Sequence, residues 1–289
     1  MTNYQTTHIV FFSPTHTSAR VAHAIAEGIG MPRRIETDLT CDEGTDTIEI
    51  SNSLTIVAAP VYGGLISETA MQRIQRLRGK NAPVIVVAVY GNRDYEDALV
   101  QLRANLTDNG FTPLAAGAFI GEHSFSRPAE DMPIAEGRPD ASDIQKAEAF
   151  GKAALEKLEK AATSLEAATS LEAEEKEIEA NTMPAALAEA ISNFFVKGNI
   201  PWKTLTHGTP TCPESTADCC ACGQCIDVCP THAITLSDDG SKIETDVNKC
   251  IRCCACLREC PVEARIYNTP YTLKLFTYFK ERREPETFL

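Results

Sequence analysis

Eight of the twelve cysteines fall into two copies of one spacing, C-x2-C-x2-C-x3-C-P, near the C-terminus. The first copy ends at Pro230 and the second at Pro261. Four thiolates held close together concentrate negative charge, and a polycationic iron–sulfur core neutralises it. The residue type and the spacing therefore predict two iron–sulfur clusters and the transfer of electrons.

The spacing resembles that of bacterial two-cluster ferredoxins, in which the fourth cysteine of each run ligates the other cluster. The resemblance implies two [4Fe–4S] clusters with crossed ligand sets. Cluster I takes Cys219, Cys222, Cys225 and Cys260. Cluster II takes Cys250, Cys253, Cys256 and Cys229. Structural zinc is the alternative, although zinc sites usually combine two distant cysteine pairs rather than three cysteines at x2 intervals.

Four further cysteines do not occupy motif positions. Cys220 and Cys254 do not fit the x2 spacing. We therefore expect them to be small residues that fill space near the clusters. The alternatives are that their sulfurs shift the cluster potential or that one of them is a substitute ligand. Cys212 is predicted to be a free thiol and Cys41 an ordinary loop residue. Because the segment 211–268 has few apolar residues, we expect metal–thiolate bonds to supply much of its stability.

A second pattern near the N-terminus suits a phosphate group. An apolar run ends in Ser13-Pro14-Thr15-His16-Thr17-Ser18, and a helical pattern follows. Hydroxyls and backbone N–H groups at a helix N-terminus make a neutral cradle for a phosphate dianion. The Walker lysine and the G-x-G-x-x-G pattern are both missing from the loop. The alternative is an ordinary strand-to-helix turn capped by Ser and Thr.

Three segments together resemble flavodoxins: the loop just quoted, Ala59-Pro60-Val61-Tyr62-Gly63-Gly64, and Tyr90-Gly91-Asn92-Arg93-Asp94-Tyr95. The resemblance implies that FMN is bound. Its phosphate contacts would come from Ser13, Thr15, His16, Thr17 and Ser18. Its ring contacts would come on one side from Pro60, Val61, Tyr62, Gly63 and Gly64, and on the other from Tyr90, Gly91, Asn92, Arg93 and Tyr95. The loop departs from many flavodoxins at His16, where they carry Gly.

Alternating strands and helices must position these segments. Apolar runs predict buried parallel strands, and a weaker strand is expected at Arg34–Asp38. The strong strands are His8–Phe12, Leu54–Ala59, Val84–Tyr90 and Leu114–Ile120. Helices are predicted at Ser18–Gly28, Ser67–Leu77, Tyr95–Asn109 and Ser142–Glu159. The alternation predicts a flavodoxin-like doubly wound parallel α/β sheet, which holds ligands at the carboxyl ends of its strands.

The chain divides into four predicted parts: a flavodoxin-like FMN-binding domain at 1–160, a helical linker at 161–210, a small α+β ferredoxin-like domain at 211–268, and a tail at 269–289. The linker repeats AATSLE at 161–172 and continues as AEEKEIEA, which favours a helical spacer. A second linker helix, Pro184–Val196, is expected to pack on a domain through Leu187, Ile191, Phe194 and Phe195.

Charge and composition limit the possible partners. The net charge of −13 disfavours nucleic acid and anionic lipid and favours docking to basic surfaces of redox proteins. We see no signal peptide and no membrane span, and thiolate ligands suit a reducing compartment. The expected location is the cytoplasm, in anaerobic metabolism. The oligomeric state is not set by the sequence.

The whole chain resembles fusion proteins that join a flavodoxin-like domain to a two-cluster ferredoxin domain. The resemblance implies an electron carrier that relays low-potential electrons between redox partners through two [4Fe–4S] clusters and FMN. One alternative is an FMN-dependent reductase of a quinone or a flavin, and another is a non-redox scaffold with an empty domain. An enzyme needs a proton donor near the ring, for which His123, Tyr95 and Asp94 are candidates. The stretch Gly121–Asp143 is expected to be an ordered loop or lid, or a surface excursion.

Overall fold

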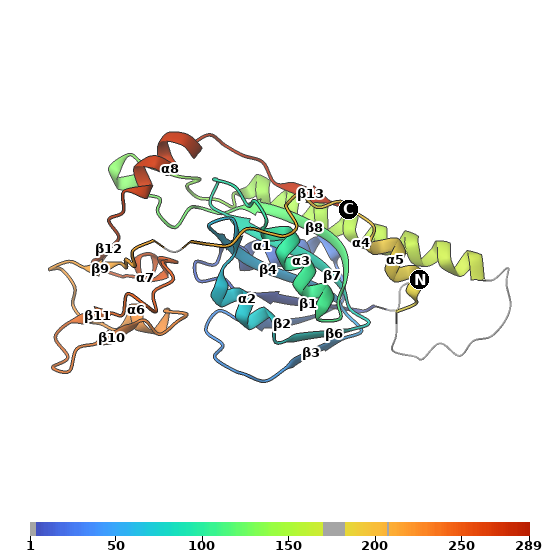
Figure 1. Cartoon of the computed structure of the whole chain (residues 1–289), viewed down its shortest axis with the longest axis horizontal. Helices are drawn as coiled ribbons and strands as arrows, with labels where there is room; N and C mark the ends of the chain where they lie inside the picture. The colour runs from blue at the N-terminus through green and yellow to red at the C-terminus, as the bar shows by residue number, and fades with distance from the viewer. Residues whose placement is uncertain (1–3, 170–182, 207) are drawn as a thin grey trace.

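The computed structural model describes residues 4–169, 183–206 and 208–289. Figure 1 shows an N-terminal α/β domain with a smaller cysteine-rich module at one end of its sheet. The second half of the repeated linker, 170–182, lies outside the described residues, so its predicted helix stays a prediction. The first half continues α4 (Ala141–Thr169).

Five parallel strands form the centre of the N-terminal domain. They are β1 (Thr6–Phe11), β2 (Arg33–Asp38), β4 (Leu54–Tyr62), β7 (Pro83–Tyr90) and β8 (Thr112–Ile120). Their spatial order is β2-β1-β4-β7-β8, which is the flavodoxin-like order in which the first strand sits second. Every residue of β7 is buried, as expected for a central parallel strand covered on both faces. The predicted fold class is therefore confirmed.

Helices cover both faces of the sheet. One face is covered by α2 (Glu68–Ile74) and α3 (Ala98–Asp108), and the other by α1 (Thr17–Ile29), α4 and α5 (Ala185–Ser192). The inner face of α1 repeats every three to four residues through Val21, Ile25 and Ile29. Gly151 of α4 lies so close to α1 that a Cβ there would stand 2.1 Å from a backbone oxygen of Ile25. A side chain at Gly151 would therefore push the two helices apart.

The linker helix is shorter than predicted. It begins after Pro184 and ends at Ser192, and it buries Leu187 and Ile191. Because the helix has already ended, Phe195 is not on its packed face and is 76% exposed. The sequence also did not predict the parallel pair β3 (Ile48–Ser51) and β6 (Leu77–Lys80), or the two-residue strand β5 (Leu65–Ile66).

The cysteine-rich module is built of short elements on a small core. Its strands form the antiparallel pairs β10 (Ile234–Leu236) with β11 (Ile243–Thr245), and β9 (Glu214–Ser215) with β12 (Arg265–Ile266). Its helices are α6 (Gln224–Asp227) and α7 (Ala255–Arg258). Half of the fully buried members of its core are cysteines, namely Cys225, Cys229 and Cys256.

The C-terminal segment returns to the N-terminal domain. After α8 (Tyr271–Phe279), the strand β13 (Glu286–Phe288) pairs antiparallel with β8 and extends the edge of the main sheet. Figure 1 shows this return past the sheet, so the module is connected to the domain at both of its ends. Among the described residues, no helix has the length and apolar character needed to cross a membrane.

Candidate functional site

The cysteines assigned to cluster II surround one cavity. Its lining includes Cys229 from the first run and Cys250, Cys253 and Cys256 from the second. The chain therefore brings the fourth cysteine of one run to the first three of the other. Cys254 also lines this cavity and is buried.

The cysteines assigned to cluster I surround a second cavity in the same crossed way. Cys219, Cys222 and Cys225 meet Cys260 in its lining. In the described part of the chain, no three His, Cys, Asp or Glu side chains converge on a point suited to a single metal ion. The eight sulfurs instead surround two volumes, which is the arrangement that a polynuclear cluster needs.

The two cavities differ in exposure. Three of the four cysteines assigned to cluster II are buried, whereas Cys222 of cluster I and its neighbour Cys220 are exposed. Burial raises the pKa of the Cys256 thiol to about 11, and the nearby Arg265 partly opposes that rise. A thiol with a raised pKa is protonated at neutral pH, so metal binding at this site would have to release its proton.

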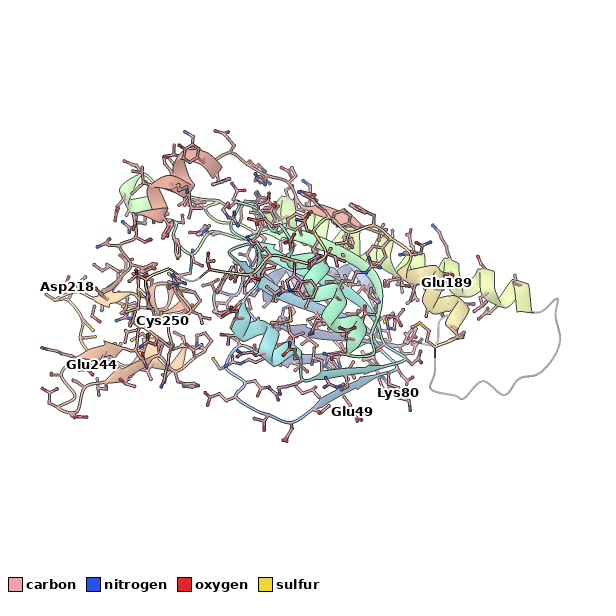
Figure 2. The ribbon with its side chains drawn as sticks, viewed as in Figure 1. Glu49, Lys80, Glu189, Asp218, Glu244 and Cys250 are labelled. Carbon is pink, nitrogen blue, oxygen red and sulfur yellow. The ribbon has the colours of Figure 1, made fainter. Side chains whose placement is uncertain are left out.

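The cavity assigned to cluster II lies on the side of the module that contacts the N-terminal domain. Ile251, between two of its cysteines, packs against the core of that domain. Arg73 of α2 donates a 2.6 Å hydrogen bond to the carbonyl of Pro230, next to Cys229. Burial, and then the thiols of Cys253 and Cys254, raise the pKa of Tyr62 at the end of β4. In Figure 2, Cys250 lies nearer the main domain than Asp218 and Glu244, which lie at the far end of the module.

The loop 121–140 ties the module to the domain. Arg127 donates a 2.6 Å hydrogen bond to the carbonyl of Tyr267, and the rings of Phe125 and Tyr267 lie 5.2 Å apart. Glu122 forms a 3.1 Å ion pair with Arg258 of α7. The predicted ordered loop is thus a bridge between the two parts.

The hydroxyl-rich loop has the backbone that a phosphate site needs. His16 occupies the left-handed region at φ 62°, where flavodoxin loops often place glycine, and α1 begins at Thr17. Ser13 is buried, and its hydroxyl accepts a 3.0 Å hydrogen bond from the Ala19 amide. The hydroxyl of Ser18 is buried without a partner among the described atoms. A buried unpartnered hydroxyl at a helix N-terminus suits an anion that the protein itself does not supply.

The side chain of His16 points toward the module. It is 70% exposed, and its Nε2 lies 3.4 Å from a carboxylate oxygen of Glu259. Thr15 and Thr17 are partly buried. The loop and the second cysteine run therefore meet at the same edge of the sheet.

The segment after β4 is a tight hairpin. Tyr62 pairs with Leu65, and both intervening glycines have positive φ, 65° at Gly63 and 91° at Gly64. This is the conformation that a two-residue primed turn requires, and glycine adopts it without strain. Gly63 is exposed, whereas Gly64 is buried beneath the ion pair of Glu96 and Lys203. Pro60, Val61 and Tyr62 are partly buried.

The segment after β7 turns its tyrosines inward. Tyr90 and Tyr95 are 3% and 1% exposed, and their rings lie 5.5 Å apart. Asn92 has φ 63° and donates hydrogen bonds to the carbonyls of Phe279 and Glu281. Arg93 forms an ion pair with Glu96 at 2.5 Å. The ring of His123 covers Gly91, since a Cβ there would stand 2.5 Å from it.

Several functional neighbours were not predicted from the sequence. The site includes Arg73, Ile251, the buried Arg265 and the tail carbonyls to which the predicted residue Asn92 donates. Ile251 could have been identified from the sequence, because an apolar residue between two cysteine ligands needs another surface to bury it. Arg265 could also have been identified, because it occupies the position at which the first copy of the motif has Ile234.

Comparisons with known proteins agree on the cysteine-rich module. Residues 213–261 match the family model of the 4Fe-4S dicluster domain. Over 49 residues the chain is 41% identical to a Halobacterium salinarum protein provisionally named as the iron-sulfur subunit of a dimethyl sulfoxide reductase. That match covers 17% of this chain and 18% of the relative. The module is thus a 4Fe–4S dicluster domain, and its cysteines imply two [4Fe–4S] clusters.

The N-terminal half is similar to solved flavodoxins. A flavodoxin from the domain Archaea is 14% identical with a TM-score of 0.35, and the match covers 53% of this chain and 97% of that one. A Fusobacterium nucleatum flavodoxin bound to flavin mononucleotide is 11% identical with a TM-score of 0.34 over the same shares. The assignment of a flavodoxin-like fold rests on the strand order described above.

Proposed function

We propose that this chain is an electron-transfer protein that relays low-potential electrons between an external redox protein and FMN in its N-terminal domain, through clusters I and II. The carrying observation is the placement of cluster II. Ile251 lines the cavity assigned to cluster II and packs against the core of the N-terminal domain, whereas the lining of the cavity assigned to cluster I includes the exposed Cys222. This arrangement supports an electron path in which cluster I exchanges electrons with the external protein and cluster II exchanges them with FMN.

The N-terminal domain fits FMN best at its phosphate end. Ser13, Ser18 and the αL turn at His16 would hold the phosphate, with the unpartnered Ser18 hydroxyl as the supporting observation. Thr15 and Thr17 would complete that contact. Tyr62, Gly63 and the backbone of 90–93 would border the ring, beside the cluster II cavity. When bound, the flavin would exchange one or two electrons, which joins one-electron clusters to two-electron chemistry.

The residues near this site favour a carrier over a reductase. Burial lowers the pKa of His123 to about 4, and its Nδ1 accepts a 3.0 Å hydrogen bond from the Phe125 amide. The Tyr95 hydroxyl donates a hydrogen bond to Glu286, and burial raises the pKa of Tyr95. Asp94 accepts from the Glu96 amide. His123 Nδ1 and the Tyr95 hydroxyl are both engaged within the protein, and pKa values far from neutral make both residues poor proton donors to a flavin.

The proposal includes the class of partner and the compartment. The exposed side of cluster I belongs to an acidic chain, so the partner is a redox protein with a basic docking surface rather than a nucleic acid. Reduced thiolate ligands favour the cytoplasm of an organism that uses low-potential electrons.

Anaerobic isolation tests the proposal. Iron, sulfide and flavin analysis should give two [4Fe–4S] clusters and one FMN per chain. Stepwise reduction followed by electron paramagnetic resonance should show two interacting clusters and a flavin signal. Saturable turnover of a quinone would favour the reductase instead, and protein without flavin after reconstitution would contradict the proposed relay.

A further inference from the structure

One arginine lies between the two cluster cavities. Arg265 lines the cavity of cluster I and also that of cluster II, and it is only 4% exposed. A buried cation needs compensating negative charge, because its desolvation is otherwise costly. Within the described part of the chain, no carboxylate forms a hydrogen bond or an ion pair with its guanidinium.

The fixed contacts of Arg265 hold its side chain in one place. Nη1 donates to the Ser215 hydroxyl at 2.9 Å, and Nη2 donates to the Pro213 carbonyl and the Thr245 hydroxyl at 3.0 and 2.9 Å. All three acceptors are neutral. They orient the guanidinium without neutralising its charge.

The remaining donor is unsatisfied. The Nε of Arg265 is buried and has no hydrogen-bond partner among the described atoms. Nη2 also lies 4.0 Å from the sulfur of Cys256, a cysteine assigned to cluster II. A buried N–H without an acceptor is rare, and it points here to an acceptor that the polypeptide does not supply.

The two copies of the motif differ in residue type at the position of Arg265. The run Cys229-Pro230-Thr231-His232-Ala233-Ile234 aligns with Cys260-Pro261-Val262-Glu263-Ala264-Arg265. Ile234 is also buried at 4% exposure and lines the cluster II cavity. The fold therefore accepts an aliphatic side chain at this point of the repeat, so packing alone does not require an arginine there.

We propose that Arg265 is a positioning and tuning residue for both clusters: its Nε–H donates to a cluster sulfur, and its buried charge raises the reduction potentials of clusters I and II together. Each cluster gains negative charge on reduction, and a fixed cation with N–H donors stabilises that charge. The inference rests on the proposed relay because it assumes that both clusters are present.

The test compares variants of the full anaerobic holoprotein. Arg265→Ile removes the charge and the donors, and the equilibrium constant for reduction should fall at least tenfold for each cluster, about 59 mV per one-electron step. Arg265→Lys keeps the charge, and its potentials should stay closer to those of the wild type. Lys242→Gln removes one exposed charge from the same module and should leave both potentials unchanged. Unaltered potentials in Arg265→Ile with full iron content would overturn the proposal.

A second measurement uses the wild-type protein and does not depend on whether a variant assembles its clusters. In reduced wild-type protein labelled with arginine that carries ¹⁵N only in its guanidinium, pulsed electron paramagnetic resonance should detect a nitrogen coupling to the clusters. A loaded wild type without that coupling overturns the role of Arg265 and leaves the relay standing. A wild type that carries no clusters at all defeats the relay itself.

Discussion

At the scale of single residues, the cavity assigned to cluster I is lined both by predicted ligands and by a cysteine that is not predicted to bind iron. Cys220 and Cys222 both line this cavity and both are exposed, so neither burial nor location separates them. The motif spacing alone predicts that Cys222 is a ligand and that Cys220 is a neighbour. This distinction makes the pair a matched test.

We expect Cys222→Ala to lose roughly half of the iron and the signal of cluster I, because a [4Fe–4S] cluster needs four protein ligands. Cys220→Ala should keep the iron content and both signals. Iron analysis and electron paramagnetic resonance of the two variants decide the matter. Equal iron loss from both would show that Cys220 also serves as a ligand.

His123 provides a prediction on pH. Its folded-state pKa of about 4 lies below the ordinary histidine value of 6.5, because burial, Arg93 and Arg258 disfavour the charged ring. The unfolded chain therefore binds the extra proton first, and stability is lost as pH falls from about 6.5 to about 4. At pH 5 the expected loss is about 2 kcal/mol relative to pH 7.

Urea unfolding of the holoprotein at pH 7 and pH 5, followed by circular dichroism, measures this loss. His123→Asn has no titrating ring, so its stability difference between the two pH values should be smaller by about 2 kcal/mol. The same pH dependence in both proteins would show that other groups cause the acid sensitivity.

At the scale of elements, β13 completes the sheet from the far end of the chain. It covers the edge of β8 through Glu286–Phe288, and Glu286 accepts the hydroxyl of Tyr95. An uncovered edge strand exposes unpaired N–H and C=O groups. The tail thus protects the sheet and holds the segment after β7 in place.

Deletion of residues 284–289 should speed amide hydrogen exchange along β8 and promote self-association through the open edge. Glu284→Ala is the control, because it removes the ion pair with Lys146 but keeps the strand. Exchange in residues 112–120 and the sedimentation behaviour provide the readouts. Wild-type exchange after the deletion would show that the edge does not need this cover.

At the scale of the whole molecule, the module is anchored on both sides. The entering chain binds Asp97 through the amides of Asn199 and Lys203 at 2.9 and 3.0 Å. The leaving chain binds Asn92 and pairs with β8. Two anchors hold the module against the N-terminal domain, so under the proposed function electron transfer within one molecule should not depend on protein concentration.

The clusters should also hold the module together. Its core is small and half of its fully buried members are cysteines, so burial alone provides little stability. Removal of iron under a chelator should unfold residues 211–268 and leave the N-terminal domain folded. Circular dichroism and limited proteolysis measure this outcome. A protease-resistant module in the iron-free protein would contradict it.

The local patterns predicted what depends on near neighbours. The five parallel strands follow from apolar runs, and the crossed grouping of Cys229 and Cys260 follows from a spacing that suits one kind of cluster. The left-handed turn at His16 was less evident, because histidine adopts it less readily than glycine. The linker helix was predicted too long, since Phe194 and Phe195 extended an apolar pattern beyond the last helical turn.

The amino-acid sequence alone was sufficient for the two cysteine sets and for the α/β order, since spacing and periodicity are local properties of a chain. Tertiary structure decided that the cavity assigned to cluster II lies on the side of the N-terminal domain, that Asn92 binds the tail, and that Arg265 lies between both cavities. These contacts join residues far apart in the chain, and their partners depend on how the module and the domain pack together, which no local pattern encodes.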